Sequence, residues 1–329
     1  WSRQHHNVRR VAQLHKAVQV GGRWLALPLA RYDGLTFGQA NDAFIEIGTD
    51  VAAEATRRAL RAAGLAPTDV DHIIFTSVTG VAAPSIDARL VNRLGMRPDI
   101  KRVPMFGLGC VAGAAGIARL HDYLRAWPDQ VAILVSVELC SLTLQREDLS
   151  IANLIASGLF GDGGAAVVAV GSERAARMGL TSASGGPTVL ATQSRFYSDT
   201  EHVMGWEIGE TGFKIVLSPD VPDMVHHHMG ADLDGFLSGN AIARTQISSW
   251  VCHPGGPKVL LAFEQALGLT RDDLQLTWNS LREVGNLSSA SVLHVLRDTM
   301  EQRRPAPGSH GVMLAMGPGF CSEFVLLRW

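Results

Sequence analysis

Three side chains that can take part in covalent acyl chemistry stand at glycine-rich turns, far apart in the sequence. Cys110 lies in FGLGCVAG, His253 in HPGGP and Asn286 in GNLSSAS. A thiol becomes an effective nucleophile when an imidazole within hydrogen-bond reach takes its proton. An imidazole and a carboxamide that aim N–H groups at one oxygen stabilise an enolate or a tetrahedral oxyanion. Together the three side chains predict acyl transfer through a covalent intermediate on Cys110.

Cys110 stands where a buried helix is expected to begin. A short apolar strand over 103–106 precedes it, and a run of Ala, Gly, Ile and Leu follows to about Trp127. That run is helical in length and too apolar to face solvent. Because a helix N-terminus stabilises a thiolate, we expect the pKa of Cys110 to be lowered. The alternative is that Cys110 is a small residue of the core.

The elements before residue 171 alternate between strands and helices. We expect a helix capped by Asn41 and ended by Gly64, strands over 72–78 and 131–139, a helix over 84–94, and a strand after the glycine turn at 158–164. This alternation predicts a layered α/β domain. ALRAAGLAPTDVDHIIFTS around Gly64 is echoed by AFEQALGLTRDDLQLTWNS around Gly268, which indicates two related halves, 1–171 and 172–329.

In the second half, the polar turns are expected to lie where Cys110 lies in the first half, between a strand and a helix. A helix is expected to begin near Pro257, after the turn of His253, and another after Asn286 with Ser288 or Ser289 as its cap. We therefore predict that His253 and Asn286 both lie at strand-to-helix junctions. In a molecule of two related halves, such junctions can face each other.

Composition limits the class of protein. With 329 residues, 47% of them hydrophobic, and a formal charge of −2, the chain is expected to be soluble and globular and not to bind nucleic acid. The four cysteines lack metal-ligand spacing, which favours a reducing cytoplasm. No apolar run is long enough to span a membrane, and no signal peptide is apparent. The sequence starts at Trp1 without a methionine, so we expect further residues upstream.

Two histidine-containing stretches remain. The basic start of the chain is expected to form a solvated amphipathic helix, or alternatively to bind the phosphates of a bulky substrate. Its side chains are Arg3, His5, His6, Arg9, Arg10, His15 and Lys16. The run from His226 to His228 is expected to be a solvated helical stretch rather than a metal site.

Several motifs resemble one known family. GCVAGAAGI, HPGGP, GNLSSAS and the GPG of Gly317, Pro318 and Gly319 are similar to signature segments of type III polyketide synthases, the chalcone-synthase-like branch of the thiolase superfamily. The resemblance covers about 34–328. It implies an acyltransferase with a duplicated five-layer αβαβα thiolase fold, a homodimer that uses an acyl-CoA starter and malonyl-CoA without cofactor, metal or carrier protein.

The resemblance also implies roles for individual residues. Cys110 would accept the acyl group, while His253 and Asn286 would polarise the malonyl thioester and stabilise the enolate formed as carbon dioxide leaves. His253 would also activate the thiol. Phe160 matches the family's aromatic gatekeeper, and the second gatekeeper position falls on Ile215, near Phe213, where plant enzymes have phenylalanine. Further cavity positions are Cys140, Thr143, Thr79, Ser288, Ala83, which replaces a methionine that crosses the dimer interface, and Trp206, which replaces a glycine.

The stretch ELCSLTLQREDLSIANLIASGLFGDG resembles bacterial members that make alkylpyrones or alkylresorcinols. We therefore expect an aliphatic acyl-CoA starter and two or three extensions. One alternative is a tetrahydroxynaphthalene-type synthase that starts from malonyl-CoA. Another is an initiating ketoacyl-carrier-protein synthase, although those enzymes usually read His-Gln-Ala-Asn where this chain has HPGG. A cysteine hydrolase and a non-catalytic acyl-CoA or lipid-binding protein on a thiolase scaffold are the remaining alternatives.

Overall fold

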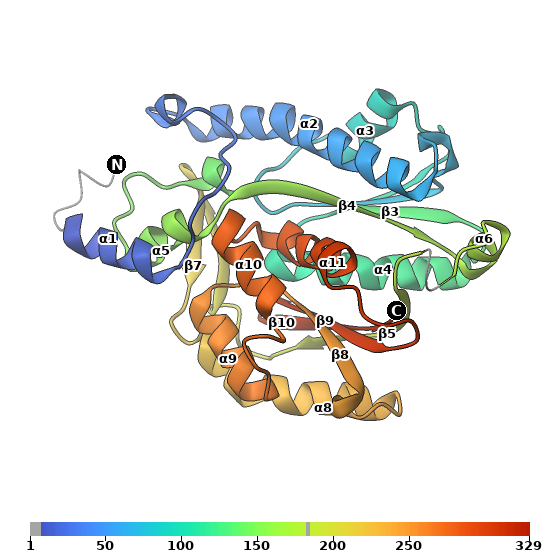
Figure 1. Ribbon diagram of the computed structural model, residues 1–329. Coiled ribbons are helices and arrows are strands. Elements are labelled where there is room, and N and C mark those ends of the chain that lie inside the picture. Colours follow the sequence, from blue (N-terminus) through green and yellow to red (C-terminus); the bar gives the residue numbers. More distant parts are fainter. Residues whose placement is uncertain (1–7, 182–184) are drawn as a thin grey trace.

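Two stacked β-sheets and three layers of helices make up the molecule (Figure 1). The computed structural model describes residues 8–181 and 185–329. In Figure 1, α2 (Phe37–Ala63) and α3 (Ile86–Leu94) cover the first sheet, α4 (Ala112–Ala126) and α11 (Ser291–Gln302) lie between the sheets, and α8 (Gly230–Gly239) and α9 (Pro257–Leu267) cover the second. These five alternating layers confirm the predicted αβαβα architecture.

The first sheet has the strand order β2-β1-β3-β4. β1 (His72–Thr76) runs parallel to β2 (Lys101–Met105) and β3 (Val131–Leu139), and β4 (Asp162–Val170) runs antiparallel to β3. Every residue of β1 and β3 is buried because helices cover both faces of the sheet. β2 is an edge strand, and its residues 101–104 are exposed.

The second sheet repeats part of this pattern in the order β5-β10-β9-β8. β8 (Ile247–Cys252) is parallel to β9 (His310–Gly317), which forms an antiparallel hairpin with β10 (Cys321–Arg328). β5 (Thr188–Phe196) pairs with the other side of β10. The remaining strands, β6 (Met204–Gly209) and β7 (Gly212–Leu217), form a separate two-stranded ribbon.

Smaller helices connect or cover these sheets. They are α1 (Val8–Ala17), α5 (Ile151–Leu159), α6 (Ser172–Arg177), α7 (Val221–Met224) and α10 (Gln275–Val284). α1 packs on α5, where the His15 Nε2 atom lies 3.2 Å from the carbonyl oxygen of Leu154. No helix in the described ranges is both long and apolar enough to cross a membrane.

A close contact between α4 and α11 ties the two sheets together. Their apolar side chains form one buried cluster that also includes residues of β1, β3, β9 and β10. A Cβ atom on Gly113 would overlap the carbonyl oxygen of Ser289 and lie 2.6 Å from Val292 Cγ1, so only glycine allows this approach. The contact brings the start of α4, next to Cys110, against the turn that precedes α11.

Some local predictions were wrong. Thr36, not Asn41, caps α2, through a capping box with Gln39. Asn41 lies inside the helix, and its amide binds the backbone N–H and C=O of Val81. By contrast, the solvated helical stretch predicted for His226 to His228 is confirmed, because they belong to the π-helical turn Val225–Met229, in which His226 and His227 are exposed. No group of three or more potential metal ligands occurs among the described residues.

The sequence echo has a narrower meaning than predicted. Gly64 and Gly268 both adopt a left-handed conformation, with φ of 66°, and both end a helix. The elements that follow differ, because 72–76 form strand β1 whereas 275–284 form helix α10. The echo therefore marks a shared way of ending a helix and not two equivalent strands.

Candidate active site

The three predicted catalytic residues reach the interior from three different junctions. Cys110 lies in a 3₁₀ turn, Gly109–Val111, between β2 and α4. His253 directly follows β8, as predicted. Asn286 follows helix α10 instead of a strand, so the predicted strand-to-helix junction was wrong there. Its backbone instead pairs with Phe160 in an isolated parallel bridge and donates to the carbonyl oxygen of Leu159.

The turn after Asn286 shapes the floor of the site. Ser288 has a left-handed φ of 47°, and the Ser288 N–H donates to Asn286 Oδ1 at 2.8 Å. This bond fixes the orientation of the amide, because it assigns the oxygen to the turn and leaves the NH₂ group free to point elsewhere. Neither Ser288 nor Ser289 caps α11 as predicted. Ser291 Oγ instead accepts from the Leu287 N–H.

Cys110, Asn286 and Ser288 meet in a buried cluster. The thiol donates to Ser288 Oγ at 3.6 Å, and the Asn286 side chain also hydrogen-bonds to the sulfur. All three residues are buried. The GPG turn, Gly317 to Gly319, packs on the residues just before Cys110. A Cβ on Gly109 would lie 2.6 Å from Pro318 Cδ, and a Cβ on Gly317 would lie 2.5 Å from the backbone oxygen of Leu108.

The predicted lowering of the thiol pKa is wrong in this structure. Burial raises the pKa of Cys110 to about 12, against the opposing effect of the Ser288 hydrogen bond. A buried thiolate loses its hydration, and that loss exceeds what the start of α4 and two neutral hydrogen bonds return. Cys110 is therefore a neutral thiol at pH 7, and its proton must be removed when it reacts.

His253 supplies a neutral base but is not bonded to the sulfur. Its backbone N–H donates to the Leu314 oxygen, whereas neither ring nitrogen has a hydrogen-bond partner among the described residues. Burial lowers the pKa of His253 to about 3, so the imidazole is uncharged at pH 7. The predicted hydrogen bond between Cys110 and His253 is absent. An unpartnered, neutral, buried imidazole is nevertheless able to accept a proton or donate one N–H bond.

Glu138 belongs to this cluster although its sequence position attracted no functional prediction. One carboxylate oxygen accepts from Ser77 Oγ at 3.1 Å, the Val78 N–H at 3.1 Å and Thr79 Oγ1 at 2.9 Å, and the other accepts from Ser289 Oγ. Burial raises the pKa of Glu138. The available signal was a single acidic residue in the mainly apolar run of strand β3, VAILVSVEL.

The remaining predicted positions fall into groups. Phe160 ends α5 beside Asn286. Trp206 and Ile215 are cross-strand partners in the β6–β7 ribbon, and the Phe213 ring lies 5.9 Å from that of Trp206.

Cys140 and Thr143 share a 3₁₀ turn after β3, in which Thr143 Oγ1 donates to the backbone oxygen of Cys140. Ala83 lines a separate cavity of about 420 Å³ beside β2.

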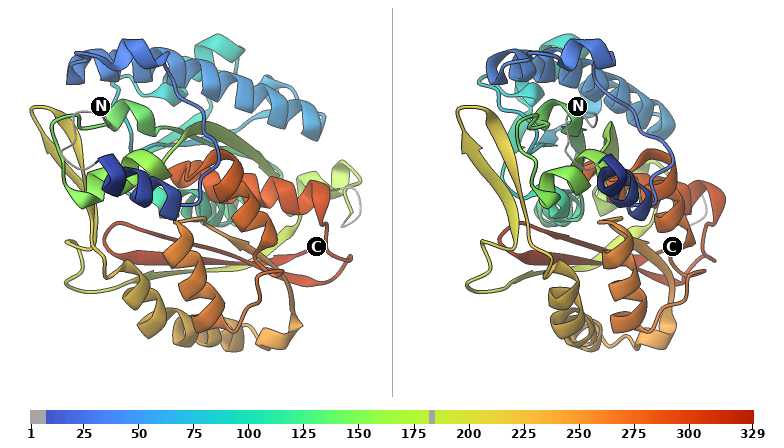
Figure 2. Two further views of the ribbon diagram at one scale, coloured as in Figure 1. Left: turned by 60° about the vertical axis from the view of Figure 1, so that its left-hand side comes forward. Right: turned by 90° about the vertical axis from the view of Figure 1, so that its left-hand side faces the viewer.

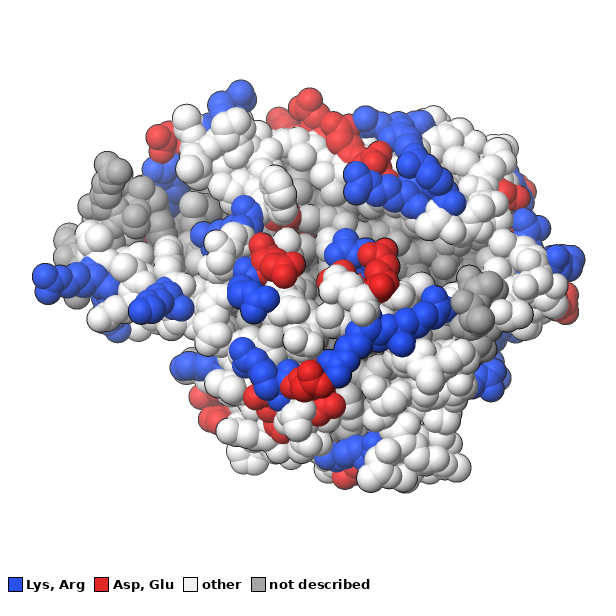
Figure 3. Space-filling view, viewed as in Figure 1, with Lys and Arg blue, Asp and Glu red and all other residues white. Residues whose placement is uncertain are grey.

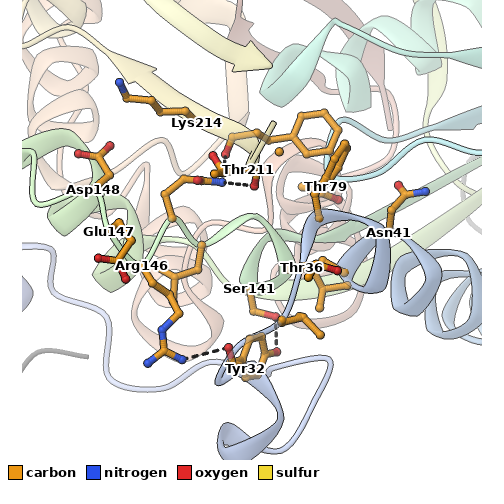
Figure 4. A pocket seen from close by; sticks show the side chains of 18 of the residues that line it. Tyr32, Thr36, Asn41, Thr79, Ser141, Arg146, Glu147, Asp148, Thr211 and Lys214 are labelled. Atoms are coloured by element: carbon orange, nitrogen blue, oxygen red, sulfur yellow. Dashed lines mark hydrogen bonds between the residues drawn. The ribbon is translucent and has the colours of Figure 1, made fainter. Parts of the chain in front are cut away.

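A larger cavity, of about 630 Å³, opens between the start of α2, the segment after β3 and the ribbon (Figure 4). Thr79 lies on its wall, as do Tyr32, Ser141 and Arg146. The Arg146 guanidinium donates to the backbone oxygen of Tyr32. The hydroxyl oxygens of Tyr32 and Ser141 are 2.6 Å apart. Because Thr79 also donates to Glu138, this cavity reaches the hydrogen-bond network of Glu138.

Known proteins match the chain along most of its length. Residues 30–174 match the family model for the N-terminal domain of chalcone and stilbene synthases, and residues 188–329 match the one for the C-terminal domain. A 1,3,6,8-tetrahydroxynaphthalene synthase from Streptomyces peucetius subsp. caesius is 57% identical, with 96% of this chain and 83% of that protein aligned. A putative chalcone synthase from Bacillus subtilis is 35% identical, with 98% and 90% aligned.

Solved structures show the same similarity. The 1,3,6,8-tetrahydroxynaphthalene synthase of Streptomyces coelicolor A3(2), a bacterial type III polyketide synthase, superposes with a TM-score of 0.91 at 29% identity. The superposition covers 99% of this chain and 91% of that chain.

Proposed function

The chain belongs to the chalcone and stilbene synthase family and is a type III polyketide synthase, and from this premise we propose that it uses malonyl-CoA both as starter and as extender, with Cys110 as the acyl-accepting nucleophile. As a type III polyketide synthase it is an acyltransferase that forms carbon–carbon bonds. The observation that carries the residue assignment is the buried cluster of Cys110, Asn286 and Ser288.

We assign the loading step to Cys110 and His253. The neutral imidazole accepts the thiol proton as the sulfur attacks the thioester carbonyl of the starter. The carbon–sulfur bond to CoA then breaks, and CoA leaves as a thiol after taking the proton from the imidazolium. The burial that raises the pKa of Cys110 to about 12 makes this base necessary, because few thiolates form without one.

We assign the extension step to His253 and Asn286. A malonyl-CoA loses carbon dioxide, and the electron pair of the broken bond forms an enolate at the thioester oxygen. N–H groups of His253 and Asn286 stabilise this oxygen, and the Asn286 amide is already oriented for this by the Ser288 N–H. The enolate carbon attacks the thioester on Cys110, and the sulfur leaves as the chain passes to CoA.

The name of the Streptomyces peucetius relative supports malonyl-CoA as the starter. The naphthalene skeleton has ten carbons with oxygens at alternate positions, which is the pattern of five two-carbon units. Trp206 also packs on Phe213, which lines the cavity of about 630 Å³, and we infer that the two rings reduce the room for a bulky starter. An aliphatic starter is the second candidate, because the cavity of about 630 Å³ that reaches Thr79 offers space for a chain.

We place the CoA phosphates near α1 and propose a homodimer. Basic side chains gather over α1 at the left of Figure 3; this helix contributes Arg9, Arg10 and Lys16, whereas Arg3, His5 and His6 lie outside the described residues. α1 packs on α5, which Phe160 directly follows. A second copy would cover the exposed edge of β2, where Val103 is 41% and Phe106 48% exposed, beside Ala83.

We further propose that 1–171 and 172–329 are the two halves of the subunit, and that CoA thioesters are used without another cofactor. The decisive experiment supplies purified protein with malonyl-CoA alone and with a series of acyl-CoAs, followed by mass analysis of the products. We expect an aromatic pentaketide from malonyl-CoA alone. A product that forms only when an aliphatic acyl-CoA is present would replace the first candidate with the second. Absence of any malonyl-dependent product would contradict both.

A further inference from the structure

The β6–β7 ribbon lies apart from both main sheets. Both views in Figure 2 show it, in yellow, rising along one flank of the molecule towards the start of α2. The ribbon carries Trp206 and Ile215 at one register position and Phe213 two residues before Ile215 on the same strand. Because alternate residues of a strand share a face, Phe213 and Ile215 point to the same side. The placement of this ribbon therefore decides where three predicted cavity residues lie.

Aromatic packing holds the ribbon to its neighbours. The Phe213 ring lies edge-on to Phe37 at 5.5 Å and lies 6.3 Å from Phe106, four residues before Cys110. A Cβ on Gly212 would lie 2.9 Å from the Phe37 ring, so the end of the ribbon fits closely against the start of α2. Such apolar contacts favour close approach, but they have little directionality and allow sliding along the strand.

Gln145 adds directional contacts at the same place. The Gln145 side-chain NH₂ donates to the backbone oxygen of Thr211 at 3.0 Å and to the backbone oxygen of Phe213 at 3.3 Å. Both acceptors are backbone atoms of the ribbon, on either side of Gly212. Two hydrogen bonds from one amide to two positions on the ribbon fix the position of the ribbon along its strand direction, which we call its height.

Asn153 holds Gln145 in turn. The Asn153 side-chain NH₂ donates to the backbone carbonyl oxygens of Gln145 and Asp148, both at 2.7 Å. Asn153 is buried near the start of α5, whose cap, Ser150, accepts from the Asn153 N–H. The same helix ends at Leu159, and the next residue, Phe160, pairs with Asn286. A chain of hydrogen bonds thus joins the ribbon to the helix that carries the predicted gatekeeper.

We propose that Gln145 is a positioning residue that, with Asn153, sets the height of the β6–β7 ribbon and thereby limits the length of the polyketide chain held beside Trp206. This inference rests on the proposed function. Gln145 also lines the cavity of about 630 Å³, but the role assigned to it acts through the ribbon and involves no contact with the reacting atoms. Its effect passes through the backbone of Thr211 and Phe213 to the cavity face of the ribbon.

The test uses the isosteric variant Gln145→Glu, which keeps the shape but loses both N–H donors. Purified wild-type and variant enzymes receive malonyl-CoA, and two quantities are measured: the rate of acyl loading on Cys110 and the ratio of the full-length product to shorter, prematurely released products. We expect loading to stay near the wild-type rate while the ratio shifts roughly tenfold. Asn153→Asp, which removes the donors of the second link, should shift the ratio in the same direction.

Gln246→Glu is the matched control. It makes the same change of charge at an exposed residue whose side-chain oxygen accepts from the Ala243 N–H, a bond that a carboxylate keeps. We expect its product ratio to equal that of the wild type. Thermal melting of all variants identifies loss of folded protein, which would lower every product equally and leave the ratio unchanged.

The outcomes separate the two levels of the proposal. If the wild-type enzyme makes no malonyl-dependent product, the proposed function fails before Gln145 is tested. If the wild type makes its product and Gln145→Glu gives the wild-type ratio, the positioning role is wrong. An equal fall of loading and of every product would also overturn it, because that result indicates a structural role alone. A changed ratio with normal loading supports it.

Discussion

The floor of the site and the β6–β7 ribbon are held in different ways. At the floor, Cys110, Asn286 and Ser288 are buried where α4 and α11 meet, and Gly113 allows that contact. The ribbon belongs to neither main sheet and is fixed by aromatic packing and by Gln145. The side chains at the floor are enclosed by the core and cannot move without disturbing it, whereas the ribbon lies outside the main sheets. We infer that the floor determines whether the reaction occurs and the ribbon determines how large the product becomes.

The largest effect should follow a change of the nucleophile at the floor. Cys110→Ala should lower acyl loading more than about 10⁴-fold, because no sulfur remains to carry the chain. Decarboxylation of malonyl-CoA should continue, since the roles assigned to His253 and Asn286 do not require the thiol. Label from acyl-CoA bound covalently to the variant would contradict the role of Cys110, and loss of decarboxylation would contradict the division of labour.

A close approach at the floor should be the next most sensitive feature. Gly113→Ala should destabilise the protein by about 1–3 kcal/mol, because the new methyl group meets the Ser289 oxygen and Val292. Gly235→Ala in α8 is the matched control. Nothing lies near a Cβ there, so the free energy of unfolding should rise by up to about 1 kcal/mol. Denaturant unfolding measures both, and equal changes would show that the α4–α11 contact is not tight.

The pH dependence of stability tests the burial of His253. Its folded pKa, about 3, lies below the ordinary value of 6.5, so the unfolded chain binds a proton first as the pH falls. The stability that His253 contributes is present above pH 6.5 and is lost as the pH falls towards 3. Between pH 7 and pH 5, wild type should lose about 2 kcal/mol more than His253→Gln. Identical losses in denaturant unfolding would mean that the imidazole is solvated.

The smallest effect on turnover should come from the ribbon. Trp206→Gly removes the ring that packs on Phe213 and should admit bulkier starters or longer products, with roughly a tenfold gain in kcat/KM for the longest starter accepted. Loading of a small starter should change little. An unchanged product profile across a series of starter lengths would show that the ribbon does not limit product size.

Prediction from sequence succeeded where local chemistry decides the outcome. The strand over 131–139 and the start of a helix at Pro257 were recovered because an apolar run and a first-turn proline act over a few residues. It failed where packing decides. Residues 275–284 resemble 72–76 and their flanks in sequence, but they form helix α10, which packs on α11. Asn41 resembled a cap but lies inside α2, because the capping box of Thr36 begins the helix earlier.

The sequence by itself determined which functional groups are available, a thiol, an imidazole and a carboxamide at glycine-rich turns, and the alternation of elements that forms five layers. Only the tertiary structure decided their state. Desolvation depends on how much protein surrounds a group, and the enclosed positions of Cys110 and His253 leave a neutral thiol and a neutral imidazole where helix-end electrostatics predicted a thiolate. Tertiary structure also placed Glu138 against the turn after Asn286, because the bond from Ser289 Oγ to its carboxylate joins segments far apart in the chain.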